Sequence, residues 1–432
     1  MQTQNHHPKI IQIEVTTRCN YDCVMCLRQE WTQPDQDFPL SEFEKLAQAS
    51  FPHVEKIILF GQGEPLMHPD FLALLKIARK YLPQKAKIDF TTNGSLLNKE
   101  IIEQISNFQI NQITVSLDSM YLIKLQKYRK GATKEIFANL DYLSNARLSG
   151  KIKELAIETV LMVSNVFDLP DLVNICYSNY PGIDSIYVSH LLPYNADLTK
   201  EICYHTVSQE NKPLRDMIIT RWQDLLFKVF HNSVGWRKKV YSGDQWVKNI
   251  REIIDSARKS DIDLDSTLII NELNNNRFIR QVQATFETIR DFNFHNRKPQ
   301  VELPPLYPQK DRRKCPYIDK SATIIRVDGQ VAPCFNFLHS HSVYINSQKR
   351  TEDAISYGNV FEQPLSTIWN NELYQNLRKR LETMPLNIPW SGDCPYISFE
   401  CFYMRNNASD CYGNSPGCNI CLYSTDQVKC IF

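Results

Sequence analysis

Short apolar runs rich in β-branched residues alternate with longer amphipathic segments through the first 195 residues. The apolar runs predict six strands, at residues 10–15, 56–60, 87–91, 112–117, 155–163 and 185–191. The intervening segments carry apolar residues at helical spacing and predict five helices, at residues 41–49, 69–81, 98–106, 134–145 and 169–179. Such alternation is typical of parallel βαβ units, and six repeats are too few for a closed eight-fold barrel. We therefore predict an α/β fold, a partial (β/α)6 TIM-like barrel.

The pattern changes twice further along the chain. Residues 196–305 are rich in charge and asparagine, with two apolar sets at helical spacing: Leu214, Ile218, Trp222, Leu225 and Val229, then Trp246, Ile250, Ile253 and Ala257. A helical insertion packed on the barrel explains them, and a lid or substrate platform is the alternative. Residues 391–432 hold six cysteines and little periodicity, so we expect metal or cross-links to stabilise them. The predicted domains are 1–195 (barrel), 196–305 (helical insertion) and 306–432 (loop-rich and cysteine-rich).

The composition gives little information about function, and its charge does not point to a strongly charged partner. The chain has a net charge of +1 and 22% charged residues, which gives no reason to expect nucleic acid or an anionic membrane as a partner. Its polar start does not resemble a signal peptide, and no apolar run is long enough to span a membrane. We therefore expect a cytoplasmic protein, in which clustered cysteines indicate metal or redox chemistry rather than disulfides.

Three of the 13 cysteines form a C-x3-C-x2-C motif directly after the first predicted strand. The motif, Cys19, Cys23 and Cys26, would therefore lie on the catalytic face of a parallel barrel. A [4Fe–4S] cluster normally takes four cysteines, so three leave one iron open to a chelating small molecule. A zinc site is the alternative, but structural zinc needs four ligands, and no local histidine or fourth cysteine supplies one.

The position and spacing of this motif resemble the radical SAM superfamily. The resemblance implies that Cys19, Cys23 and Cys26 hold a [4Fe–4S] cluster whose open iron binds S-adenosylmethionine (SAM). Reduction would cleave SAM to methionine and a 5′-deoxyadenosyl radical, which takes hydrogen from the substrate. Met25 occupies the position at which the family usually places an aromatic or bulky apolar residue near adenine.

Further barrel motifs resemble the same family at the ends of later strands. Gly61-Gln-Gly-Glu-Pro65 resembles its GGEP motif, although Gln62 departs from it. The "TNG" and "SLD" positions also match, as does the end of the fifth strand. The resemblance therefore implies these SAM contacts: Gly63, Glu64, Pro65, Thr92, Asn93, Ser116, Asp118 and Asn165. In isolation, a plain turn, an Asn-Gly turn, an Asx cap or a helix cap would explain the same residues.

The C-terminal cysteines resemble a second family signature. Cys315-x13-Gly329-x4-Cys334 is similar to the SPASM domain, an extension that holds auxiliary [4Fe–4S] clusters. Six further cysteines depart from the usual spacing: Cys394, Cys401, Cys411, Cys418, Cys421 and Cys430. Eight thiolates are enough for two more clusters, three in all. The assignment of each cysteine to a cluster stays open, as does the alternative of one or two zinc sites.

These resemblances imply a radical SAM/SPASM enzyme, and three hypotheses differ in what it acts on. The leading one is a maturase that modifies a peptide or protein side chain, reduced by a donor such as flavodoxin or ferredoxin. The second is maturation of a small cofactor such as a tungsten or molybdenum pterin, since the C-terminal segment resembles maturases for a tungsten-dependent aldehyde oxidoreductase. The third is a non-catalytic, zinc-stabilised binding protein. No general base can be named, and Tyr194 is a candidate by position alone.

Overall fold

The computed structural model describes most of the chain outside its middle third. The described residues are 7–213, 266–294, 298–346, 348–394 and 401–430, with isolated positions between 216 and 259. The two helical patterns predicted between Leu214 and Ala257 lie outside the described residues. Among the described residues, no helix has both the length and the apolar character needed to cross a membrane.

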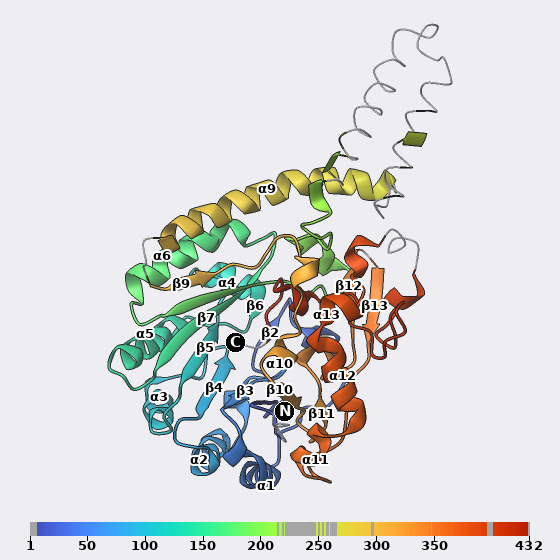
Figure 1. Ribbon diagram of the computed structural model, residues 1–432. Helices are drawn as coiled ribbons and strands as arrows, with labels where there is room; N and C mark the ends of the chain where they lie inside the picture. The colour runs from blue at the N-terminus through green and yellow to red at the C-terminus, as the bar shows by residue number, and fades with distance from the viewer. Residues whose placement is uncertain are drawn as a thin grey trace.

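A single nine-stranded sheet forms the centre of the molecule, in the order β11-β10-β1-β3-β4-β5-β7-β8-β9 (Figure 1). Strands β10 to β9 in this order run parallel, and β11 is antiparallel to β10. The strands span Ile10–Ile13 (β1), Lys56–Leu59 (β3), Lys87–Thr92 (β4), Gln112–Ser116 (β5), Glu154–Leu161 (β7), Ser185–His190 (β8), Gln300–Glu302 (β9), Ala322–Ile325 (β10) and Val331–Ala332 (β11).

Helices alternate with the strands and cover the outer face of the sheet (Figure 1). They are α1 (Leu40–Ser50), α2 (Phe71–Tyr81), α3 (Lys99–Ser106), α4 (Leu122–Tyr128), α5 (Glu135–Leu148) and α6 (Leu169–Asn179). Helix α2 shows why they pack there. It buries Phe71, Leu74, Leu75 and Ala78, which recur at the three- and four-residue spacing of one helical face. The long helix α9 (Ser266–Phe294) crosses above α6.

The predicted α/β fold is confirmed, with all six predicted strands present in sequence order across the sheet. Three short strands, β9, β10 and β11, extend this sheet and were not predicted. They have two to four residues each, which is too short for a periodic signal, and their pairing partners are distant in sequence. Helix α4 was also not predicted; it has seven residues and no side-chain cap.

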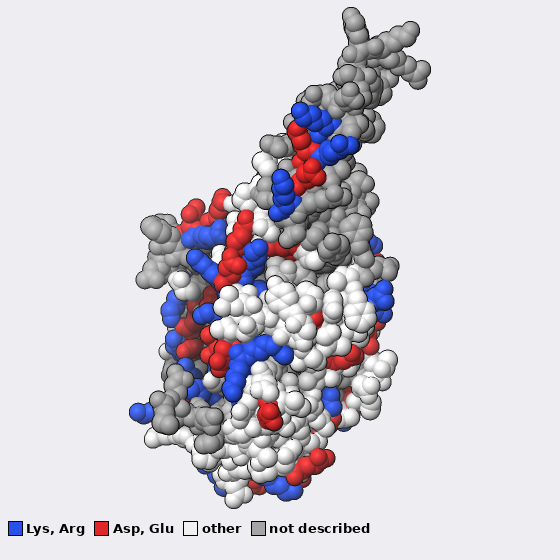
Figure 2. Space-filling model, turned by 45° about the vertical axis from the view of Figure 1, so that its right-hand side comes forward, with Lys and Arg blue, Asp and Glu red and all other residues white. Residues whose placement is uncertain are grey.

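The C-terminal part packs beside the β10–β11 end of the sheet (Figure 1). It contains α10 (Pro316–Asp319), the hairpin β12 (His341–Ile345) and β13 (Gln348–Glu352), α11 (Leu365–Trp369), α12 (Glu372–Glu382) and α13 (Met384–Asn387). Residues 401–430 have short 3-10 turns and no longer element. A two-stranded ribbon of β2 (Asp22–Cys23) and β6 (Arg129–Lys130) lies over the barrel. In the view of Figure 2, basic and acidic side chains are interspersed, without a continuous field of one sign.

Candidate active site

Cys19, Cys23 and Cys26, here the barrel cysteines, line a cavity over the carboxyl ends of the parallel strands. This barrel cavity also receives residues that follow β3 and β4 and residues from the ends of β5, β7 and β8. Carboxyl ends of parallel strands meet at one edge of a sheet, and this is where barrel enzymes place their active sites. The fold therefore brings the motif together with segments more than 160 residues further along the chain.

Most of the residues predicted to contact SAM line the barrel cavity with these cysteines. Those in its wall are Met25, Gly63, Glu64, Thr92, Asn93 and Ser116. Tyr194, a candidate by position, also lies there. Pro65, Asp118 and Asn165 are not part of the wall. The structure shows what Asp118 and Asn165 contact instead.

The Glu64 carboxylate connects the loop after β3 to the end of β4. It accepts hydrogen bonds from Thr92 Oγ1 (2.7 Å), the Asn93 backbone N–H (2.6 Å) and the Leu66 backbone N–H (3.2 Å). Burial raises the pKa of Glu64 to about 7, against the effect of these donors. Because both carboxylate oxygens are occupied within the protein, Glu64 orients the cavity wall rather than offering a free carboxylate to a ligand.

Gly63 lets this loop lie directly against the loop that carries the barrel cysteines. A Cβ atom at Gly63 would lie 2.3 Å from the carbonyl oxygen of Thr16 and 2.7 Å from that of Arg18. The next residue, Glu64, donates its backbone N–H to the Arg18 carbonyl at 2.7 Å. A side chain cannot fit at this contact, which explains a glycine here by close backbone approach.

Asp118 holds Arg129 beside the cysteine loop. The carboxylate accepts from the Val160 backbone N–H at 2.8 Å and forms an ion pair with Arg129 Nε at 2.7 Å. Arg129 lines the barrel cavity and pairs with Cys23 across the β2–β6 ribbon. Burial raises the pKa of Cys23 to about 12, and the positive charge of Arg129 acts in the opposite direction. Asp118 therefore acts on the site through Arg129.

Asn165 stabilises the turn that follows β7. Its side chain accepts a hydrogen bond from the Met162 backbone N–H and donates one to the Val160 carbonyl, both at 2.8 Å. The side chain does not cap α6, which was the alternative expectation. Its role in the described structure is to shape the end of a barrel strand.

Two buried carboxylates near the cavity were not singled out by sequence. Glu14 is fully buried and accepts from the Gln62 backbone N–H (3.0 Å), the Val327 backbone N–H (3.3 Å) and His339 Nε2 (2.9 Å). It thereby connects the end of β1, the loop after β3 and the C-terminal part. A carboxylate within the apolar run of residues 10–15 was the available signal, since such a group needs partners when buried.

Glu158 is the second such carboxylate and lies in the wall of the barrel cavity. Burial raises its pKa to about 7, and the charge of Arg129 opposes this shift. It belongs to β7, whose end resembles the family, but the resemblance assigned a SAM contact there only to Asn165. A group with a pKa near neutrality can hold or release a proton at physiological pH.

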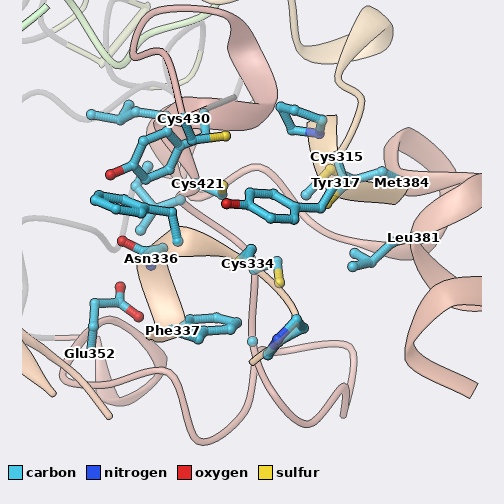
Figure 3. A pocket seen from close by; sticks show the side chains of 18 of the residues that line it. Cys315, Tyr317, Cys334, Asn336, Phe337, Glu352, Leu381, Met384, Cys421 and Cys430 are labelled. Carbon is cyan, nitrogen blue, oxygen red and sulfur yellow. The ribbon is translucent and has the colours of Figure 1, made fainter. Parts of the chain in front are cut away.

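Five of the eight C-terminal cysteines line a second cavity, the cysteine cavity. These are Cys315, Cys334, Cys418, Cys421 and Cys430. Figure 3 shows Cys315, Cys334, Cys421 and Cys430 around it, with Tyr317, Phe337, Leu381 and Met384 among the surrounding side chains. Burial raises the pKa of Cys315 to about 12. Thiols in such surroundings become thiolates when they bind a metal.

The other three C-terminal cysteines, Cys394, Cys401 and Cys411, form a separate group. Burial raises the pKa of the Cys411 thiol, and nearby Asp410, Cys394 and Cys401 raise it further. The fold thus divides the eight cysteines into five and three, a grouping that sequence spacing did not indicate. Cys176 and Cys203, which belong to neither the barrel nor the C-terminal cysteines, are both fully buried.

These sulfur donors fit iron–sulfur clusters in two places. The barrel cysteines face a cavity that also has room for a ligand beside the Gly63 loop. The cysteine cavity offers more than the four soft sulfur donors that one cluster needs, in an apolar enclosure. Among the described residues, no group of three donors is spaced to hold a single metal ion.

Comparison with known families defines the class of protein. Residues 13–164 match the model of the radical SAM superfamily, and residues 315–395 match that of SPASM, an iron–sulfur cluster-binding domain. The chain belongs to the radical SAM enzymes with a C-terminal SPASM domain, and its cofactors are [4Fe–4S] clusters and SAM. The alternative of a non-catalytic zinc protein is therefore wrong.

Particular relatives span different parts of the chain. The tungsten-containing aldehyde ferredoxin oxidoreductase cofactor-modifying protein of Pyrococcus furiosus is 26% identical over 428 residues, or 98% of this chain and 97% of that protein. A GTP 3′,8-cyclase of Rhodopseudomonas palustris is 28% identical over 42% of this chain and 53% of the cyclase. SuiB of Streptococcus suis, solved with SAM bound, has a TM-score of 0.51 at 17% identity, over 87% of this chain and 68% of SuiB, which shows a shared fold.

Proposed function

We propose that this protein is a maturase that removes a hydrogen atom from a substrate held between the barrel cysteines and the cysteine cavity. One observation carries the proposal: the two cavities share wall residues. Leu192, Phe335, Tyr423 and Cys430 line both. A substrate in the barrel cavity would therefore lie next to the C-terminal cysteines, within reach of a second redox centre.

The barrel cysteines are proposed to hold the cluster that binds SAM. When bound, this group supplies one electron to SAM and so provides the 5′-deoxyadenosyl radical. Gly63 and the Glu64 carboxylate fix the loop that would face the SAM amino group. Arg129, held by Asp118, places a positive charge beside the cysteine loop. The eight C-terminal cysteines are proposed to hold two auxiliary clusters, which exchange an electron with the substrate or bind it.

A peptide or protein side chain is the first substrate class that we propose. SuiB has also been solved bound to its precursor peptide SuiA. That structure has a TM-score of 0.50 to this protein, over 86% of this chain and 67% of SuiB. The test is co-expression with each short peptide encoded beside the gene, followed by mass spectrometry of the peptide. A mass change that requires Cys26 supports this substrate class. Unchanged masses throughout would exclude peptides from the genomic neighbourhood.

A small cofactor is the second substrate class. The Pyrococcus furiosus relative matches nearly the full length of both chains, and its name assigns it to the modification of an oxidoreductase cofactor. Deletion of the gene should then leave a partner oxidoreductase inactive, while Cys176→Ala in this protein should leave it active. An oxidoreductase with full activity in the deletion strain would contradict this proposal. For either class, we propose reduced flavodoxin or ferredoxin as the electron donor, tested by replacing a chemical reductant with each protein.

A further inference from the structure

A third cavity lies where the partial barrel fails to close. Strands β9 and β11 are the two ends of the sheet. One wall of this edge cavity contains Tyr187 of β8 and Glu302 of β9, and the other contains Asp319 at the end of α10 and Lys320, shortly before β10. Residues 423–426 and 428–430 also line it. The cavity therefore occupies the gap between the two sides of the open barrel.

Basic side chains predominate in the edge cavity. Among the described residues that line it, five are basic (Arg290, Arg312, Lys314, Lys320 and Lys429) and three are acidic (Glu302, Asp319 and Asp426). Five minus three leaves an excess of two positive charges, whereas the whole chain of 432 residues has a net charge of +1. The cavity thus concentrates positive charge that the rest of the chain offsets, which favours an anionic ligand.

The basic residues differ in depth. Arg290, Arg312 and Lys314 are exposed, whereas Lys320 is partly buried and the Lys429 side chain is 13% exposed. Lys429 pairs with Asp426 at 2.5 Å, but the Asp426 side chain is 68% exposed, so water screens this pair. Lys320 and Lys429 are therefore the two deeper basic side chains of the edge cavity, and their ammonium groups could both donate hydrogen bonds to a multivalent anion.

The inner end of the edge cavity borders the barrel cavity. Tyr423, Val428, Lys429 and Cys430 line both, and Tyr423 and Cys430 also line the cysteine cavity. A ligand anchored at Lys320 and Lys429 would therefore have its other end beside the proposed site of hydrogen abstraction.

We propose that the edge cavity binds the phosphate of a small phosphorylated substrate and directs the rest of that molecule toward the barrel cavity. The binding of phosphate is independent of the proposed function, and only the later removal of a hydrogen atom from the substrate rests on it. A phosphate offers three acceptor oxygens and about two negative charges, which match the two inner lysines, Lys320 and Lys429. The guanidinium of Arg312 at the rim adds donors in a fixed fork suited to phosphate.

Calorimetric titration of the reconstituted full-length protein with inorganic pyrophosphate, under anaerobic conditions without SAM, tests this proposal. The variants are Lys320→Gln, Arg312→Gln and the double variant, with Lys45→Gln as the control. Lys45 loses the same charge on the exposed face of α1, with a side chain that is 72% exposed. We expect each cavity variant to weaken pyrophosphate binding about tenfold, and the control to match the wild type.

Two outcomes would overturn the proposal. One is that pyrophosphate does not bind the wild type, or binds the wild type and all four variants equally well. The other is tight binding of a pentaglutamate peptide with none of pyrophosphate, which would assign the cavity to acidic peptides. Thermal unfolding midpoints equal to that of the wild type show that the variants are folded. Because no SAM cleavage is measured, a failure of the radical chemistry would leave the binding result intact, and the two can be told apart.

Discussion

The barrel cysteines and the C-terminal cysteines reach their sites in different ways. The barrel cysteines occupy eight consecutive residues on one loop after β1, so their grouping depends on local backbone. The C-terminal cysteines span residues 315 to 430 and form their groups only after a hairpin, four helices and a loop-rich segment have packed. A compact motif can thus be recognised from spacing, whereas a dispersed set is defined by the fold. Variants of each set can therefore show whether the two sets bind iron independently.

Removal of thiols from either set of cysteines has the largest expected effect, which is a loss of bound iron. The triple variant Cys19→Ala, Cys23→Ala, Cys26→Ala should lose about four iron atoms per chain and keep the rest, because each cluster has its own ligands. Cys421→Ala should lose iron only from the C-terminal part. Iron and sulfide assays with electron paramagnetic resonance measure both, and Cys176→Ala, in buried α6, is the matched control. Loss of all iron from either variant would show that the sets are coupled.

Asp118→Asn should cause the next largest effect, about 3–5 kcal/mol in the free energy of unfolding. The Asp118 side chain is fully buried, and its carboxylate lies 2.7 Å from Arg129 Nε. The substitution therefore leaves the buried Arg129 guanidinium without its charged partner. Urea unfolding of the metal-free protein measures the loss. The exposed pair of Glu42 with Lys45 is the comparison, and Glu42→Gln should cost under about 1 kcal/mol. Equal losses for the two variants would show that the buried pair stabilises the protein no more than the exposed pair does.

Gly63→Ala should reduce SAM cleavage about 10- to 100-fold, since a small displacement of reacting groups has effects of this size. The added methyl group would contact the Thr16 carbonyl and push the two loops of the barrel cavity apart. The rate of 5′-deoxyadenosine formation measures this. Gly150→Ala is the control, because nothing lies within 4 Å of its Cβ position and only its positive φ opposes the change. A Gly63→Ala enzyme with wild-type rates would contradict the close approach.

The smallest expected effect is at Asp184, far from both cysteine sets. Burial acts to raise its pKa, but hydrogen bonds from Arg147, Lys298 and the Leu155 backbone N–H hold the pKa below its usual value. A carboxylate with a lowered pKa stabilises the fold above its unfolded pKa, and this stability is lost as the pH falls. Asp184→Asn should therefore cost about 1 kcal/mol at pH 7, and the difference should shrink below about pH 4. Urea unfolding at both pH values checks this, and a difference independent of pH would contradict it.

Much of the barrel could be predicted because its elements have local signals. Helix α2 follows a helical period of apolar residues over its 11 residues, and strand β1 lies in a short β-branched apolar run. Strands β9 and β10 could not be predicted in this way, since their identity depends on pairing with β8 and β1. Short segments gain their structure from such distant partners, which a local pattern does not contain.

The candidate site shows the same division. The barrel cysteines and the Gly63–Glu64 loop were recognised from local motifs, whereas Glu14 and Arg129 were not. Glu14 acts through His339, which is 325 residues away, and Arg129 acts through Asp118, which lies earlier in the chain, after β5. The grouping of the C-terminal cysteines into five and three likewise required the fold, because Cys315 and Cys430 lie at opposite ends of their segment.

Production of 5′-deoxyadenosine shows whether the barrel cysteines hold a cluster that cleaves SAM. The full-length protein would be reconstituted anaerobically with iron and sulfide, then given SAM and a strong reductant, beside Cys26→Ala and the control Cys176→Ala. We expect 5′-deoxyadenosine from the wild type and from Cys176→Ala, and none from Cys26→Ala. An iron-loaded wild type that makes none, or a Cys26→Ala variant that makes as much as the wild type, would contradict the assignment of the barrel cysteines.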